Sequence, residues 1–362
     1  MIDLASTPII ILVILGSVGV ALPVVGIALK ERPSMMSYGI ATVIALFAAI
    51  GYVLYQLALD HVAPAAIFSQ DVLVDDAFGA LFAIAMLIVA IFTTVGSFSY
   101  MKNKANPSVY FSLILLSAIG MVLVAYATDL VMLFVAWELM SIPTYILVGF
   151  LKKDPISNEA AIKYFLFGAL SSAIIIYGIS LAYGITGSTN IGEVIQGFMV
   201  LDANLIPIGL LAVGMFIAGF GFKMGLVPFH MWLPDTYEGA PPTIATLLAA
   251  GTKKAGFAAA LRVIVMGTVA LSLDWTLALG IIAVMTMTVG NIAAIMQKKS
   301  GSNVSLFQHW TCGIYLDWFV HCTIFYYWSS RIYVPHTKSC CNERCSIHCS
   351  CGNCNCISGY TC

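Results

Sequence analysis

Five ionisable side chains lie inside long apolar runs of this sequence, and they combine an acid, lysines and an imidazole. They are Glu138, Lys163, Lys223, His230 and Lys253. A charge near the middle of a bilayer costs several kcal/mol unless it is paired or hydrated, so such side chains face a bundle interior or a water path. A lysine beside a carboxylate favours the charged form of both groups, and moving them apart drives one to lose or gain a proton. The set therefore indicates proton movement within a membrane, with no cofactor bound by this chain.

Glu138 and Lys223 have the most informative surroundings. Glu138 lies in the middle of an apolar run, where it is either half of a structural ion pair or a carboxylate controlled by a mobile cation. Lys223 follows Gly219 and Gly221 and precedes Pro228, a composition that loosens or breaks a helix. Broken helices at mid-membrane are typical of transporters. The alternative for Lys223 is a side chain that extends to the membrane interface.

The other three candidates each have a simpler alternative. His230 titrates near neutrality and could relay protons, but it could equally cap a helix end. Lys253 is followed by Lys254, and neighbours on a helix point about 100° apart, so only one can easily face a given partner. Lys163 comes four residues after Glu159, which is also the spacing of a purely structural ion pair.

These residues must be positioned by membrane-spanning helices. The composition is 60% hydrophobic and only 9% charged, whereas soluble domains carry about a quarter charged residues. Long apolar runs recur at close to the length that a helix needs to cross the hydrocarbon core. They are residues 8–29, 38–59, 77–98, 109–126, 130–151, 160–183, 205–232, 242–268 and 271–296. The sequence therefore predicts an all-α polytopic membrane protein with about nine spans.

The charged residues between the runs predict the orientation. Nine crossings place all the basic loop residues on one side and acidic residues on the other. The basic set is Lys30, Arg32, Lys102, Lys104, Lys152, Lys153, Lys298 and Lys299, and the acidic set is Asp3, Asp60, Asp71, Asp75, Asp76, Glu193, Asp202 and Asp274. This pattern predicts a plasma-membrane protein with an outside N-terminus and cytoplasmic basic loops. Arg262, near the outer end of its run, is expected to be an interfacial anchor. No nucleic-acid partner is expected.

The last part of the chain differs from the rest, because all ten cysteines lie at Cys312 or later. Cys351, Cys354 and His348 could form a metal knuckle or part of a disulfide cluster, although the spacing is too crowded for one four-ligand site. We favour a tail translated out of frame. Shifting each codon by one base restores a plausible apolar helix, alanine codons preceded by T become cysteine, and Lys298-Lys299 marks a possible slippage site.

Several segments resemble the antiporter-like membrane subunits shared by respiratory complex I and multisubunit cation/proton antiporters. Among these, the segments resemble most subunit N of complex I-type enzymes. The motifs are WELMSIP at 137–143, EAAIKYFLFGA at 159–169, GFKMGLVPFHMWLPDTYEGAP at 221–241 and KKAGF at 253–257. The resemblance implies that Glu138 and Lys223 form an ion pair, that Lys253 is the central relay lysine, and that Lys163 assists. It also implies two inverted five-helix repeats with a broken helix, the seventh span, in the first. We expect a three-helix segment at 1–107, the first repeat at 108–268, the start of the second at 269–299 and the anomalous tail at 300–362.

The same resemblance implies a proton-translocating subunit that assembles with other membrane and peripheral subunits of a complex I-like dehydrogenase. A quinone or methanophenazine, a flavin and Fe-S clusters are then expected elsewhere in the complex. The sequence resembles most the version found in methanogenic archaea, a dehydrogenase that oxidises a reduced deazaflavin. Two alternatives stay open. One is a subunit of a sodium/proton antiporter. The other is a non-conducting assembly subunit or pseudogene product, since only one half-channel is expected from the chain as written.

Overall fold

The computed structural model describes residues 6–29, 34–59, 72–102, 104, 106–270 and 275–296, with side chains except at 264–278 and 293–296. The chain divides into two units, Met1–Val320 and His321–Cys362, and the second lies wholly outside the described residues. The predictions about the cysteine-rich tail, its reading frame and its metal or disulfide alternatives therefore fall outside the described part. So do the loops that carry Lys30, Arg32, Lys298 and Lys299.

Helices make up almost all of the described chain, which confirms the predicted all-α membrane class. Seven are long and apolar enough to cross a membrane: α1 (Thr7–Ala28), α2 (Met35–Ala58), α3 (Ala77–Tyr100), α4 (Pro107–Tyr126), α5 (Leu130–Val148), α6 (Pro155–Thr186) and α8 (Ile206–Met224). The others are α7 (Ile191–Met199), α9 (Leu233–Gly239), α10 (Pro242–Thr246), the π-helical segment η1 (Leu247–Thr252), α11 (Lys253–Ala270) and α12 (Trp275–Met296). The count of nine spans stays a prediction.

The helix starts follow from local chemistry. Asp76, Asp129 and Asp154 cap α3, α5 and α6, and each carboxylate accepts backbone N–H groups of the first turn. Proline occupies the first turn of α1, α4, α6 and α8, where its missing N–H costs nothing. These signals mark the first residues of the helices.

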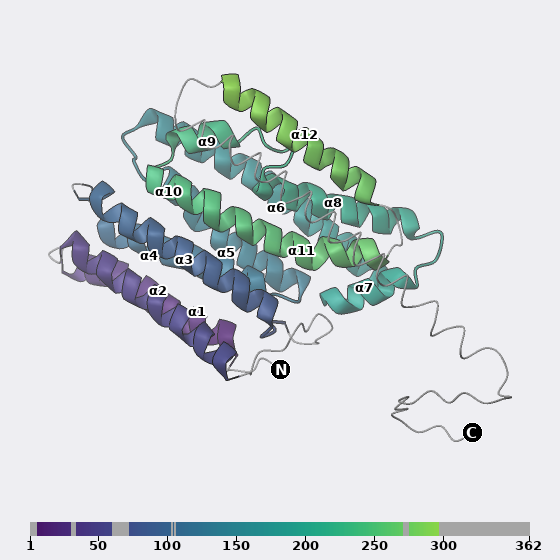
Figure 1. Cartoon of the computed structure of the whole chain (residues 1–362), viewed down its shortest axis with the longest axis horizontal. Helices are drawn as coiled ribbons and strands as arrows, with labels where there is room; N and C mark the ends of the chain where they lie inside the picture. Colours follow the sequence, from purple (N-terminus) through teal and green to yellow (C-terminus); the bar gives the residue numbers. More distant parts are fainter. Residues whose placement is uncertain are drawn as a thin grey trace, which may run out of the picture. The chain divides into compact units, whose positions relative to one another are not determined.

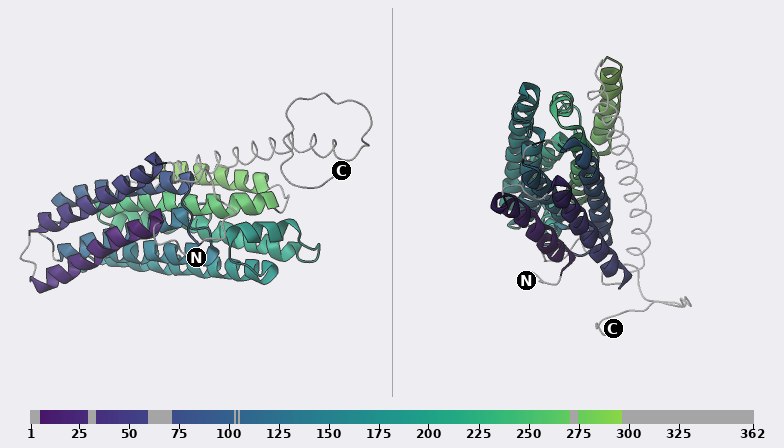
Figure 2. Two further views of the ribbon diagram at one scale, coloured as in Figure 1. Left: turned by 90° about the horizontal axis from the view of Figure 1, so that it is seen from below. Right: turned by 90° about the vertical axis from the view of Figure 1, so that its left-hand side faces the viewer.

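The helices run alongside one another, with α1 and α2 at one edge and α12 at the opposite edge (Figure 1; Figure 2 gives two further sides). Helix α4 is the most buried span and packs against α1, α3 and α5. Gly120 permits its close approach to α5, because a Cβ at this position would lie 2.2 Å from the backbone nitrogen of Met140. The core therefore sits around α4, and α5 places Glu138 beside α6 and α8.

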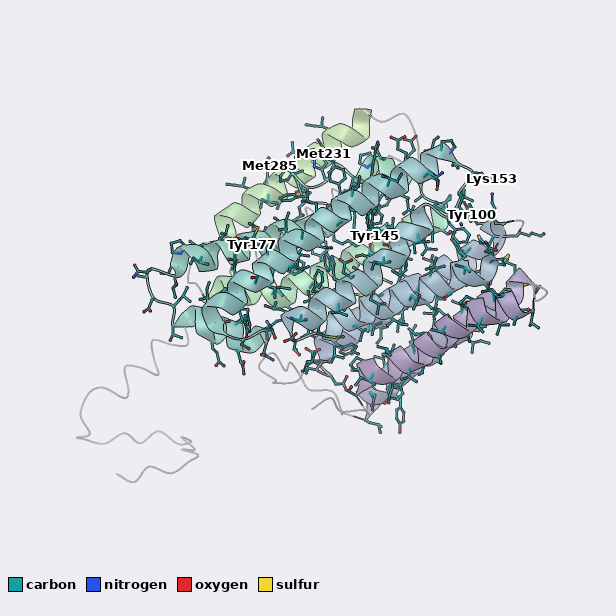
Figure 3. All side chains as sticks on the ribbon, turned by 180° about the vertical axis from the view of Figure 1, so that it is seen from behind. Tyr100, Tyr145, Lys153, Tyr177, Met231 and Met285 are labelled. Carbon is teal, nitrogen blue, oxygen red and sulfur yellow. The ribbon has the colours of Figure 1, made fainter. Side chains whose placement is uncertain are left out.

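The lysines in the described loops between α3 and α6 lie at one end of the helices. Tyr110 at the start of α4 contacts Phe150 just after α5, with ring centroids 5.0 Å apart, and Figure 3 shows Tyr100 and Lys153 at this same end. The connections after α3 and α5, with Lys102 and Lys152, thus share one end of the helices. Isolated β-bridges join Leu73 to Ala127 and Asp129 to Asn190 at the other end, where acidic residues precede α3.

The seventh predicted run is helical only as far as Met224. Gly225 ends α8 with a φ of 74°, a left-handed conformation that glycine adopts without steric cost. The freed N–H of Val227 donates to Thr286 Oγ1 of α12 at 3.2 Å. The chain then turns until α9 begins at Leu233. The helix is therefore broken as expected, but it ends at Gly225 and not at Pro228. The apolar run predicted to reach Trp232 extends beyond the end of the helix.

Candidate functional site

Lys223 lies in the last turn of α8, immediately before the break, and its side chain is only 1% exposed. Its Nζ donates to Tyr164 Oη at 2.7 Å and to Ser141 Oγ at 3.1 Å. The rings of Tyr164 and Tyr145 also face it, with centroids 5.0 and 5.6 Å from Nζ. A cation can be held here by neutral oxygens and aromatic faces.

Glu138 lies on α5, half-buried, and accepts a short hydrogen bond from Ser172 Oγ of α6. The expected direct ion pair with Lys223 is not formed, because the two described side chains make no N–O contact within 4.0 Å. They are nevertheless neighbours. Ser141, which binds the Lys223 ammonium, comes one helical turn after Glu138 on α5.

Lys253 begins α11 directly after the π-helical segment η1, and its side chain is 2% exposed. Its Nζ lies 5.6 Å from the ring centroid of Tyr237, which belongs to α9. Lys254 is half-buried by comparison. One turn later, Gly256 lets α11 pack on the end of α8, since a Cβ there would lie 3.7 Å from Lys223 Cβ. The packing of α11 on α8 thus brings Lys253 close to the helix that carries Lys223. Helical segments of the π type, such as η1, often occur at functional sites.

Lys163 and His230 lie around this core rather than in it. Lys163 Nζ pairs with Glu159 Oε1 at 2.7 Å and with Asp235 Oδ2 at 2.6 Å, and its side chain is 39% exposed. It therefore ties α6 to α9, and its neighbour Tyr164 is the residue that contacts Lys223. His230 is half-buried in the turn between α8 and α9, and its carbonyl accepts the backbone N–H of Leu233. The relay roles of both residues stay predictions.

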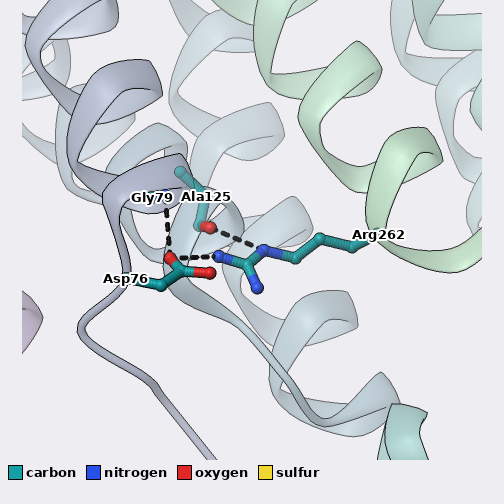
Figure 4. Close-up of polar contacts among 4 residues, drawn as sticks. All are labelled: Asp76, Gly79, Ala125 and Arg262. Atoms are coloured by element: carbon teal, nitrogen blue, oxygen red, sulfur yellow. Dashed lines mark hydrogen bonds and ion pairs between the residues drawn. The ribbon is translucent and has the colours of Figure 1, made fainter. Parts of the chain in front are cut away.

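Arg262 forms a buried charge pair that the sequence did not predict (Figure 4). Its Nη2 donates to Asp76 Oδ1 at 2.7 Å and its Nε to the Ala125 carbonyl at 2.8 Å. The exposed fractions of the Arg262 and Asp76 side chains are 4% and 1%, and the Phe78 ring lies 4.8 Å from the guanidinium. Asp76 also accepts from Gly79 N at the start of α3. The expectation of an interfacial anchor was wrong, because this arginine is neutralised inside the bundle.

Comparisons with known proteins agree with this architecture. Residues 127–300 match the family described as NADH:quinone oxidoreductase/Mrp antiporter, TM. This segment includes the broken helix, Glu138, Lys223 and Lys253. The matched segment belongs to this family of antiporter-like membrane subunits.

Individual relatives narrow the likeness to subunit N. The chain is 44% identical over 233 residues to F(420)H(2) dehydrogenase subunit N of Methanosarcina mazei, covering 64% of this chain and 47% of that protein. It is 41% identical over 300 residues to NADH-quinone oxidoreductase subunit N of Desulfitobacterium hafniense, covering 82% of this chain and 58% of the relative. The chain thus spans roughly half the length of these relatives.

Solved structures share the fold. A chain of respiratory complex I from Thermus thermophilus matches with a TM-score of 0.68 and 30% identity, over 84% of this chain and 62% of that one. A chain of an archaeal membrane-bound sulfane sulfur reductase matches with a TM-score of 0.75, over 86% of this chain and 64% of that one. At 21% identity the second likeness concerns the fold alone. This chain is accordingly a membrane-embedded protein.

Proposed function

We propose that this chain is a proton-translocating membrane subunit of a complex I-like dehydrogenase, in which reduction of a quinone-type acceptor or methanophenazine drives proton export. The observation that carries the proposal is the placement of Lys223, which is buried at the end of a broken helix. It binds Ser141, which lies one turn of α5 after Glu138. A buried lysine beside a carboxylate is a costly arrangement in a membrane, and function is the usual reason to keep one.

The proton-handling groups would work in sequence. Glu138 would take up a proton when Lys223 moves away and release it when the ammonium returns, since an opposite charge favours the ionised carboxylate. Lys253, on the helix that packs against the end of α8, would be the next site. Lys163 would assist from α6, and His230 from the turn between α8 and α9. The subunit itself would hold no cofactor, and the flavin, the Fe-S clusters and the acceptor would belong to partner subunits.

Membrane orientation follows the charge pattern of the loops. We place the loops with Lys102 and Lys152 in the cytoplasm of a plasma membrane and the N-terminus outside, with lipid and other complex subunits around the helices. The acidic residues near the start of α3 would then lie at the outer side of the membrane.

An antiporter subunit is the second candidate, because the matched family includes Mrp antiporters. The two functions predict different results in the same vesicle experiment. In vesicles that contain the whole complex, a pH-sensitive dye should report proton movement when the electron donor is added, with or without sodium. A sodium gradient that moves protons without any electron donor would support the antiporter instead. Absence of both signals in an assembled complex would contradict the proposal.

A further inference from the structure

The two ionisable groups of the site are each bound by a neutral hydroxyl from the same helix. On α6, Tyr164 binds the Lys223 ammonium and Ser172 binds the Glu138 carboxylate. The second acceptor for Lys223 is Ser141 of α5. The described structure therefore shows the lysine and the carboxylate separated, each with partners of its own.

The hydrogen bonds around Tyr164 can run in only one direction. An ammonium group has donors and no acceptor, so Tyr164 Oη must accept from Lys223. Thr144 Oγ1 donates its single proton to the Ser141 carbonyl at 2.7 Å. Thr144 Oγ1 must therefore accept the Tyr164 hydroxyl proton across the 3.3 Å contact between them. Tyr164 thus directs a lone pair of its hydroxyl oxygen toward Lys223, while its hydroxyl proton points toward Thr144.

The position of this hydroxyl is fixed by packing. Tyr164 is fully buried and its ring stacks on Trp232, with centroids 4.8 Å apart. Trp232 belongs to the turn after the break, and its Nε1 donates to the Phe222 carbonyl of α8 at 3.0 Å. Trp232 therefore holds Tyr164 against the last turn of α8, which carries Lys223.

We infer that Tyr164 is a positioning residue which, together with Ser141, holds Lys223 apart from Glu138 in one state of the proton-transfer cycle. The inference rests on the proposed function of the pair and adds a residue to it. Without the Tyr164 oxygen, the ammonium keeps one of its two neutral acceptors. The nearby carboxylate of Glu138 then becomes the better partner, because hydrogen bonds between charged groups are roughly twice as strong as neutral ones. Lys223 would move onto Glu138 and keep that carboxylate ionised.

The test is the reactivity of Glu138 in the purified complex toward dicyclohexylcarbodiimide, a hydrophobic reagent that modifies protonated carboxyl groups. Mass spectrometry of the peptide that contains Glu138 measures the modified fraction, and Glu138→Gln gives the background. Tyr164→Phe keeps the ring and its stacking but removes the acceptor oxygen. We expect it to lower the modification of Glu138 several-fold. Tyr177→Phe is the matched control, since it makes the same change on the same helix at an exposed position, and it should leave the modification unchanged.

Ser141→Ala removes the other neutral acceptor and provides a second variant, for which we expect a loss in the same direction. Equal modification of Glu138 in Tyr164→Phe, Ser141→Ala and the unaltered chain would overturn the inference. So would a Glu138 that is unmodified in the unaltered chain, because the carboxylate would then already be paired. The measurement needs no electron transfer, so these outcomes are independent of whether the complex pumps protons.

Discussion

Arg262 of α11 and Asp76 at the start of α3 form an ion pair with a 2.7 Å N–O distance, although 186 residues separate them in the sequence. Both side chains are almost completely buried. The pair joins the predicted N-terminal three-helix segment to the helix that carries Lys253. It therefore fixes α11 against α3 at the end remote from the basic loops.

Asp76→Asn should destabilise the protein strongly, because it leaves the Arg262 guanidinium buried without its charged partner. Removal of one member of a buried pair costs about 3–5 kcal/mol. The double variant Asp76→Asn/Arg262→Gln should lose less than the sum of the single losses. Thermal unfolding of the detergent-solubilised complex measures this, with the exposed Asp202→Asn as control. A midpoint for Asp76→Asn equal to that of Asp202→Asn would show that the pair contributes no stability.

The sequence predicted the membrane-spanning helices because a span requires a long apolar run. It did not locate the end of α8. Residues 225–232 are still mostly apolar, and the left-handed conformation of Gly225 has no hydropathy signal. Hydropathy reports where a chain is buried in lipid and not where its backbone turns.

The sequence also missed the residues that contact the charged groups. Ser141 and Tyr164 are ordinary uncharged residues of apolar helices, and only the packing of α5, α6 and α8 shows that they meet Lys223. One signal was present: Ser141 follows Glu138 by three residues and so lies on the same helix face. Arg262 was misassigned because its partner Asp76 belongs to a distant segment that periodicity cannot relate to it.

Gly120 should be intolerant of any side chain. A Cβ at this position would lie 2.2 Å from the Met140 backbone nitrogen, so Gly120→Ala must push α4 and α5 apart. Overpacking of this kind typically costs 1–3 kcal/mol, and we expect about that loss. Gly51→Ala on α2 is the control, since no atom lies within 4 Å of a Cβ there. Equal thermal stability of the two variants would mean that the helices are not closely packed at Gly120.

Lys253 and Lys254 should differ in function although they are adjacent. Lys253 is 2% exposed and faces Tyr237, whereas Lys254 is only half-buried. Lys253→Ala should reduce proton movement per electron to near background, because a relay needs its next proton site, and Lys254→Ala should have a much smaller effect. The dye signal in vesicles divided by the electron-transfer rate measures both. Equal losses for the two variants would argue against a specific relay role for Lys253.

Cysteines introduced at Lys102 and Lys152 should be protected from an impermeant thiol reagent added outside intact cells, because the one-sided basic loops predict a cytoplasmic location. A cysteine at Asp202, in an exposed loop, should react. Peptide mapping by mass spectrometry separates these sites from the native cysteines, all of which lie at Cys312 or later. Reaction of both Lys102 and Lys152 positions from outside would reverse the orientation.

The most direct test of the proposed proton pathway is the number of protons moved per electron in vesicles that contain the complex with Glu138→Gln. A pH-sensitive dye records the protons, and electron transfer is measured separately. We predict that Glu138→Gln and Lys223→Ala each lower the ratio strongly, and that the double variant loses much less than the sum, because the second change removes a partner already lost. Glu193→Gln, an exposed acid on α7, should keep the ratio. An unchanged ratio in Glu138→Gln, with the complex intact, would contradict the proposal and leave Glu138 a structural residue.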